Sequence, residues 1–98
     1  MTIKRLLRLK HGRRDLGFLS ARVMKEDDVL ASWLLRVESP ADLDEFRSHL
    51  LAGSTMSLSM VTGDGDHLRG EAAVSTVSDA YDAATIVTLA GLGPLRAT

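Results

Sequence analysis

The sequence contains no cysteine, only two prolines and four aromatic residues, and no long apolar run. Without cysteine, neither a disulfide framework nor a thiolate metal site is available, which is compatible with a reducing cytoplasm. No apolar stretch is long enough to cross a bilayer, and basic residues interrupt segment 1–11 where a signal peptide would need an apolar run. A chain of 98 residues is therefore expected to form a single domain, residues 1–98, with one hydrophobic core and no membrane partner.

The charge is almost balanced in total, at −1, but it is unevenly distributed. Segment 1–14, the basic N-terminal segment, contains no acid, whereas the remaining residues carry a net charge of −7. We expect this segment to contact phosphates or an acidic protein face, or to pair with acids of its own chain or of a neighbouring copy. Because no aromatic residues are interleaved, pairing with acids of its own chain or of a neighbouring copy is favoured. The basic residues are Lys4, Arg5, Arg8, Lys10, Arg13 and Arg14.

Alternation of apolar and polar residues predicts β-strands in the first part of the chain. Segment 3–9 shows both helical and strand spacing, and we favour a strand. Leu19, Ala21 and Val23 alternate with polar neighbours, and the acidic run 26–28 suits a hairpin loop. Segment 29–38 is the best core strand, with Trp33 as its expected anchor.

A helix is predicted for about residues 40–52. Ser39 can cap it, Pro40 suits the first helical position and Asp42 nearly completes a capping box. Gly53 directly follows the predicted helix, at the position where a residue in the left-handed conformation commonly ends a helix. The apolar stripe expected to lie across a sheet consists of Leu43, Phe46, Leu50 and Leu51.

Further β-strands are predicted after the helix. Segment 55–60 alternates strictly, segment 62–67 is a turn by composition, and 68–78 is the return strand. A loop at 79–83 precedes a last strand at 85–90, which Gly91, Gly93 and Pro94 are expected to end. The predicted fold class is α+β, mainly β: a small β-sandwich or barrel of about five to six mostly antiparallel strands with one flanking helix.

Candidate chemical sites are few. Asp64, Asp66 and His67 offer cation ligands, but their spacing matches no calcium loop or zinc pattern, and a solvated turn is the favoured reading. Gly91-Leu92-Gly93 is followed by no helix that could supply an anion site. The three histidines, His11, His49 and His67, fall in three different elements without a serine elbow or a cysteine. We therefore predict no catalytic residue, no cofactor and no metal, and expect no enzyme.

Three segments resemble the end of major tail proteins of long-tailed phages: 49–55 (HLLAGST), 68–75 (LRGEAAVS) and 84–95 (ATIVTLAGLGPL). The resemblance covers about half of the chain. It implies a β-sandwich or barrel flanked by a helix, whose copies join edge to edge in six-fold rings that stack into a DNA-conducting tube. It also implies other tail proteins as partners, a virion location after assembly in the host cytoplasm, and neither enzymatic activity nor a cofactor.

Two functional hypotheses follow. In the first, the protein is a self-assembling tail-tube, adaptor or terminator subunit, in which basic residues contact acids on an adjacent copy. In the second, it is a small cytoplasmic binding module whose basic N-terminal segment meets nucleic acid or an acidic protein. The proposed assembly contacts are Lys4, Arg5, Arg8, Arg13 and Arg14 with Asp64, Asp66 and Glu71; the proposed structural positions are Trp33, Gly53, Gly70, Gly91 and Gly93.

Overall fold

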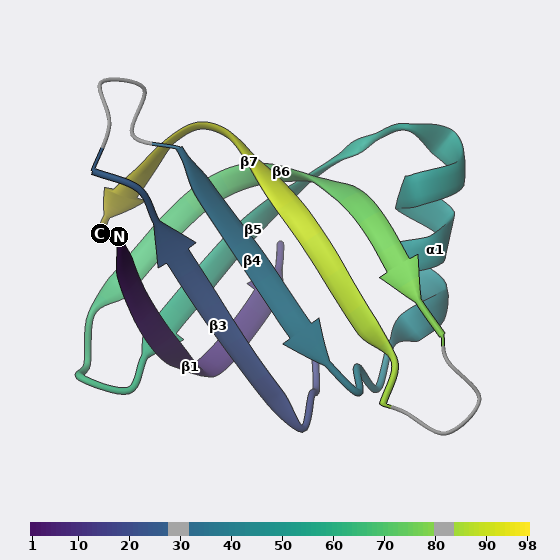
Figure 1. Cartoon of the computed structure of the whole chain (residues 1–98), viewed down its shortest axis with the longest axis horizontal. Coiled ribbons are helices and arrows are strands. Elements are labelled where there is room, and N and C mark those ends of the chain that lie inside the picture. The colour runs from purple at the N-terminus through teal and green to yellow at the C-terminus, as the bar shows by residue number, and fades with distance from the viewer. Residues whose placement is uncertain (28–31, 80–83) are drawn as a thin grey trace.

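The protein, seen in a computed structural model that describes residues 1–27, 32–79 and 84–98, is built mainly from β-strands (Figure 1). The described part of the chain also contains one helix. The elements are β1 (Thr2–His11), β2 (Arg14–Asp15), β3 (Ser20–Lys25), β4 (Trp33–Glu38), α1 (Leu43–Ala52), β5 (Thr55–Thr62), β6 (His67–Ser78) and β7 (Ile86–Ala97). The predicted fold class, mainly β with one flanking helix, is confirmed.

Six antiparallel strands close into a barrel in the order β1-β3-β4-β7-β6-β5, and the short β2 is added to β1. Closure depends on β1, because its first half pairs with β3 and its second half pairs with β5. The pairing register shifts between Leu6 and Arg8, and an irregularity of this kind bends a strand. Of the two predicted architectures, sandwich or barrel, the molecule is therefore a barrel.

The barrel interior is filled by the apolar side chains that strand alternation predicts. Trp33, Leu35 and Val37 on β4 are buried, whereas Leu34 and Arg36 between them are exposed. Met56, Leu58 and Met60 are buried in the same way on β5. The first residues of the predicted strand 29–38, up to residue 31, lie outside the described residues.

Two expectations at the start of β3 and the end of β7 are wrong. Leu19 does not face the core but is 72% exposed, because β3 begins only at Ser20 and the preceding Phe18 packs against the core instead. β7 does not end at Gly91 but continues to Ala97, because its last residues keep pairing with β6. Gly93 and Pro94 fall at an irregularity of this pairing, between Leu92 and Arg96, and proline and glycine are typical of such irregular positions.

The helix begins three residues later than predicted. Ser39 has a left-handed φ of 50° and donates its N–H to the carbonyl of Thr85, so it does not cap a helix at Pro40. Asp42 is the N-cap residue but makes no side-chain capping hydrogen bond. At the other end Gly53 has a φ of 65°, and its N–H donates to the carbonyl of Leu50, which confirms the predicted C-terminus.

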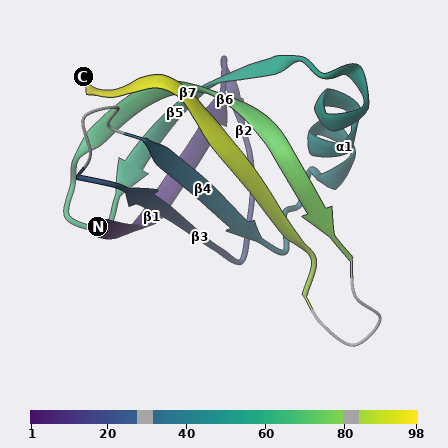
Figure 2. The same cartoon turned by 45° about the horizontal axis from the view of Figure 1, so that its top comes forward.

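The helix lies beside β6 at one end of the barrel, as both views show (Figures 1 and 2). Phe46 is fully buried and Leu43 is partly buried against the core. The predicted apolar stripe is wrong at its end, since Leu51 is 88% exposed and Leu50 is also exposed. Within the described residues no helix combines the length and the apolar character needed to cross a membrane.

Candidate assembly and binding surfaces

The basic N-terminal segment is not a separate arm, because most of it forms β1. Lys4 lies on the same face of β1 as the buried Leu6, and its Nζ is 2.5 Å from Oδ2 of Asp66 and 3.1 Å from Oδ2 of Asp64. Both aspartates belong to the turn between β5 and β6. Three residues expected to meet between copies thus pair within one chain, at the end of the barrel.

Hydrogen bonds hold this turn in place. The hydroxyl of the buried Thr62 donates to Asp64 Oδ1 and accepts the N–H of Asp66 at 3.0 Å. The Thr62 hydrogen bond, followed by the one from Lys4, lowers the pKa of Asp64 below its ordinary value of 3.8. The hydrogen bonds to Asp66 and then Asp64 raise the pKa of Lys4 above 10.5. Each group therefore favours the charged form of the other.

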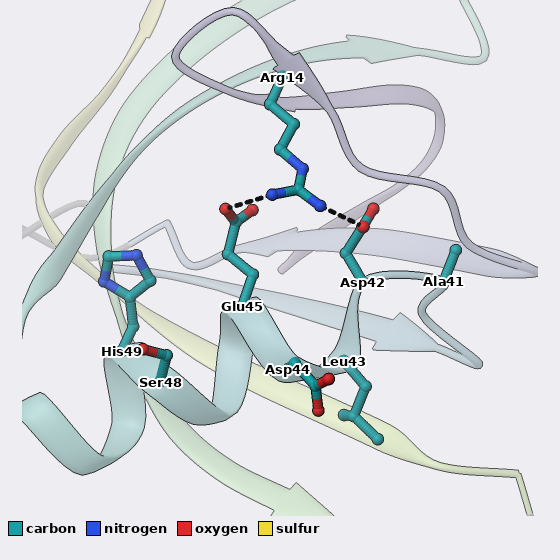
Figure 3. Close-up of a pocket in the computed structure, with 8 residues that line it drawn as sticks. All are labelled: Arg14, Ala41, Asp42, Leu43, Asp44, Glu45, Ser48 and His49. Atoms are coloured by element: carbon teal, nitrogen blue, oxygen red, sulfur yellow. Dashed lines mark hydrogen bonds and ion pairs between the residues drawn. The ribbon is translucent and has the colours of Figure 1, made fainter.

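Arg14 on β2 links the first hairpin to the helix. Its guanidinium lies 2.7 Å from Oδ1 of Asp42 and 3.4 Å from Oε1 of Glu45. Figure 3 shows the side chain reaching toward both carboxylates. The three side chains help to line a hollow of about 470 Å³. Because Arg14 is well exposed to solvent, the two ion pairs orient the hairpin more than they stabilise the fold.

Two of the three histidines meet beside this hollow. The ring centroids of His11 on β1 and His49 on α1 are 5.0 Å apart in an edge-to-face arrangement. His11 Nδ1 lies 3.6 Å from Oε2 of Glu45, an oxygen that is buried without a hydrogen-bond partner, and His49 Nδ1 lies 2.7 Å from the hydroxyl of Ser54. The sequence placed these histidines in separate elements, and no local spacing could have shown that the fold brings them together.

The remaining predicted contact residues differ in their partners. Arg8 lies 3.8 Å from Asp15, also within the chain, whereas Arg5 and Arg13 form no ion pair among the described residues. Glu71 accepts a hydrogen bond from the hydroxyl of Ser57. Pairing with the chain's own acids thus accounts for Lys4, Arg8 and Arg14. No cluster of three or more histidine or acidic side chains in the described part of the chain is arranged to hold a metal ion.

Trp33 joins β4 to the last part of β7. It is 3% exposed, and its Nε1–H donates to the carbonyl of Gly93 at 3.1 Å. A Cβ atom on Gly91 would lie 2.2 Å from the indole ring, and one on Gly70 would lie 2.6 Å from it. These two glycines, singled out as backbone-packing positions, leave the space that the indole occupies.

The last part of β7 forms a strand edge. β4 pairs with β7 only between Ile86 and Ala90, whereas β6 pairs with β7 as far as Ala97. From Gly91 onward, no strand in the described part of the chain covers the second side of β7. Leu92 on this edge is 46% exposed. As far as the described residues show, the barrel is therefore closed along most of its circumference but keeps one edge segment, 91–97.

No family model, curated protein or solved structure matches this chain.

Proposed function

We propose that this protein is a structural, self-assembling subunit without enzymatic activity, a component of a phage tail of the tube, adaptor or terminator type. The observation that supports this proposal is the edge segment 91–97 of β7, whose second side pairs with no strand among the residues that the structure describes. An unpaired edge presents N–H and C=O groups that can bind a strand of another molecule. We infer that copies associate through this segment.

The edge segment has the length and the composition of a contact surface. At about 3.3 Å per residue, seven residues extend over roughly 23 Å. Leu92 and the partly buried Leu95 provide apolar contacts on either side of Pro94, whose missing N–H is tolerated on an edge strand. The hydrogen bond from Trp33 to Gly93 ties the segment to the barrel, so that little ordering is needed when a partner binds.

The phage-tail part of the proposal is supported by the resemblance of segments 49–55, 68–75 and 84–95. In the fold these segments are the helix end, the middle of β6 and most of β7, and the last two pair directly. The resemblance implies rings of six copies. In such a head-to-tail ring the edge segment meets a different surface of the next copy, so the interface is heterologous. The proposed location is then the virion.

Self-association is tested by light scattering coupled to size exclusion over a range of protein concentrations, with negative-stain microscopy for rings or tubes. We expect concentration-dependent oligomers from the unaltered protein. Leu92→Lys should shift them toward monomer, because a charged lysine on an edge opposes strand pairing. Leu51→Lys is the matched control, since Leu51 is more exposed but lies on α1. A monomer at every concentration, or equal assembly of both variants, would contradict the proposal.

A further inference from the structure

Strands β1, β3 and β4 lie next to one another in the barrel wall (Figure 1). Two rows of side chains cross the outer face of these strands. In the first row, Arg5 stands opposite Arg22, which in turn stands opposite Arg36. The second row lies two residues away from the first on each strand. In it, Ile3 stands opposite Met24, and Met24 stands opposite Leu34. We call these six residues the Arg–apolar face.

The arginine row is unfavourable for the isolated chain. Like charges directly opposite each other on neighbouring strands destabilise a sheet. All three arginines are exposed, and none of them has an ion-pair or hydrogen-bond partner in the part of the chain that the structure describes. Glu38 lines a hollow of about 240 Å³ together with Arg22 and Arg36 but forms no ion pair with either. An external anionic partner would remove this repulsion.

The neighbouring apolar row shows which anionic partner fits. Ile3 is 58% exposed and Leu34 is 39% exposed, and Met24 between them is half-buried. Arginine and methionine beside apolar side chains are typical of protein–protein interfaces. A phosphodiester backbone would leave the apolar row uncovered. None of the six described residues of the face is aromatic, so they offer no ring on which bases could stack.

Within residues 1–27, 32–79 and 84–98, a second copy of the chain offers no matching row of acids. Ion pairs engage only Lys4, Arg8, Arg14 and Arg47 among the described residues, so eight of the 12 Lys and Arg residues have none. The described acids outside ion pairs lie on four different elements or loops and form no row. These acids are Glu26, Glu38, Asp44 and Glu71.

We propose that the Arg–apolar face binds a partner protein through an acidic amphipathic helix that lies across the strands. Neighbouring strands are about 4.8 Å apart. Residues three or four apart on a helix have Cβ atoms about 5–6 Å apart, so carboxylates at that spacing can each meet one arginine. Arginine holds a carboxylate through two parallel hydrogen bonds. An apolar stripe beside the carboxylates then covers Ile3, Met24 and Leu34.

The probe is a fluorescein-labelled helical peptide of about 18 residues, long enough to populate a helix, with a Glu stripe beside a Leu stripe. Fluorescence polarisation measures its binding to the full chain. We expect salt-sensitive binding that the double variant Arg22→Glu/Arg36→Glu weakens at least about tenfold, and that Leu34→Ser weakens several-fold. The control is Arg69→Glu, because Arg69 is exposed, has no ion pair among the described residues and lies on β6, which neighbours none of β1, β3 and β4. The control should change binding by less than about twofold.

Thermal unfolding separates binding from folding. Arg22→Glu/Arg36→Glu places a Glu opposite Arg5 and leaves positions 22 and 36 like-charged, so the row goes from two like-charged pairs to one. The variant should therefore not lower Tm, and a folded variant that fails to bind is the expected result. Three outcomes would overturn the proposal: no binding of the peptide, equal binding by the Arg22/Arg36 variant, or duplex DNA bound more tightly than the peptide and insensitive to Leu34→Ser. Dissociation of protein oligomers by the Arg22/Arg36 variant would assign the face to a second copy instead. The effect of Leu92→Lys bears only on the assembly proposal.

Discussion

The backbone of Gly91 packs directly against the indole of Trp33, and this contact provides a test of the fold. Gly91→Ala adds one Cβ atom, at a position 2.2 Å from Cε2 and Nε1 of Trp33 and 2.4 Å from Cδ2. These atoms belong to a rigid ring that is 3% exposed. The ring therefore cannot turn aside as a flexible side chain would, and either the strand or the whole indole must move.

The expected loss of stability can be bounded from these contacts. Inserting one carbon into a well-packed core destabilises by about 1–3 kcal/mol. If the indole is displaced altogether, the loss approaches the roughly 3–5 kcal/mol of a large aromatic truncation. The hydrogen bond from Trp33 to Gly93 would be lost as well, at about 1 kcal/mol. Each kcal/mol lowers Tm by roughly 4–8 °C in a domain of this size.

Urea unfolding followed by tryptophan fluorescence measures this loss directly, because Trp33 is the single tryptophan. The control is Gly63→Ala, since a Cβ there lies 3.6 Å from the carbonyl oxygen of Arg5, an ordinary contact. In a Trp33→Leu background, where urea unfolding is followed by circular dichroism because no tryptophan is left, the Gly91→Ala change should lose most of its effect, as coupled neighbours do in a double-mutant cycle. If Gly91→Ala and Gly63→Ala have equal unfolding free energies, the packing argument is wrong.

Two further predictions concern the barrel end and the helix end. Lys4→Met removes both ion pairs to Asp64 and Asp66. Because the folded pKa of Asp64 is below 3.8, its contribution is present above that pH and disappears as the pH falls through the folded value. The raised pKa of Lys4 keeps its contribution below 10.5 and loses it as the pH rises further. The Tm difference between Lys4→Met and the unaltered protein should thus be largest between these limits and shrink outside them; a pH-independent difference in circular-dichroism melting would contradict this. Gly53→Ala forces a residue with a Cβ into the left-handed conformation at φ 65° and should cost about 1 kcal/mol in urea unfolding, and a stability equal to that of Gly63→Ala would refute the cap.

Much of the fold was predictable because strand alternation is a local property. The buried faces of β4 and β5, the turn at 62–67 and the helix end at Gly53 all follow from residues close together in the chain. The helix start was missed because its cause is not local. The N–H of Ser39 donates to the carbonyl of Thr85, and the N–H of Ala41 donates to the carbonyl of Gly17. Both partners are distant in sequence.

For the candidate sites too, local features were predictable from the sequence and contacts between distant residues were not. A basic N-terminal segment is visible in the composition, but only pairing geometry shows that Lys4 and Arg14 are engaged within the chain while Arg5 is not. In the sequence, Arg22 and Arg36 are each a single polar residue between apolar ones, and this pattern does not predict a binding site. A signal did exist, since each occupies an outward position of a strand, but their alignment with Arg5 requires knowing which strands are neighbours.

The order of the amino acids alone was enough to specify a mainly β fold with one helix, the inward and outward faces of β4 and β5, and the glycine that ends the helix. These features depend on side-chain periodicity and on backbone preferences, which act over a few residues. Tertiary structure alone decided that β1 bends to close the barrel, that β7 continues along β6 past Gly91, and that three arginines align across β1, β3 and β4. Pairing register between distant strands sets all three, because hydrogen bonding and packing across the barrel outweigh the local preference of any one residue.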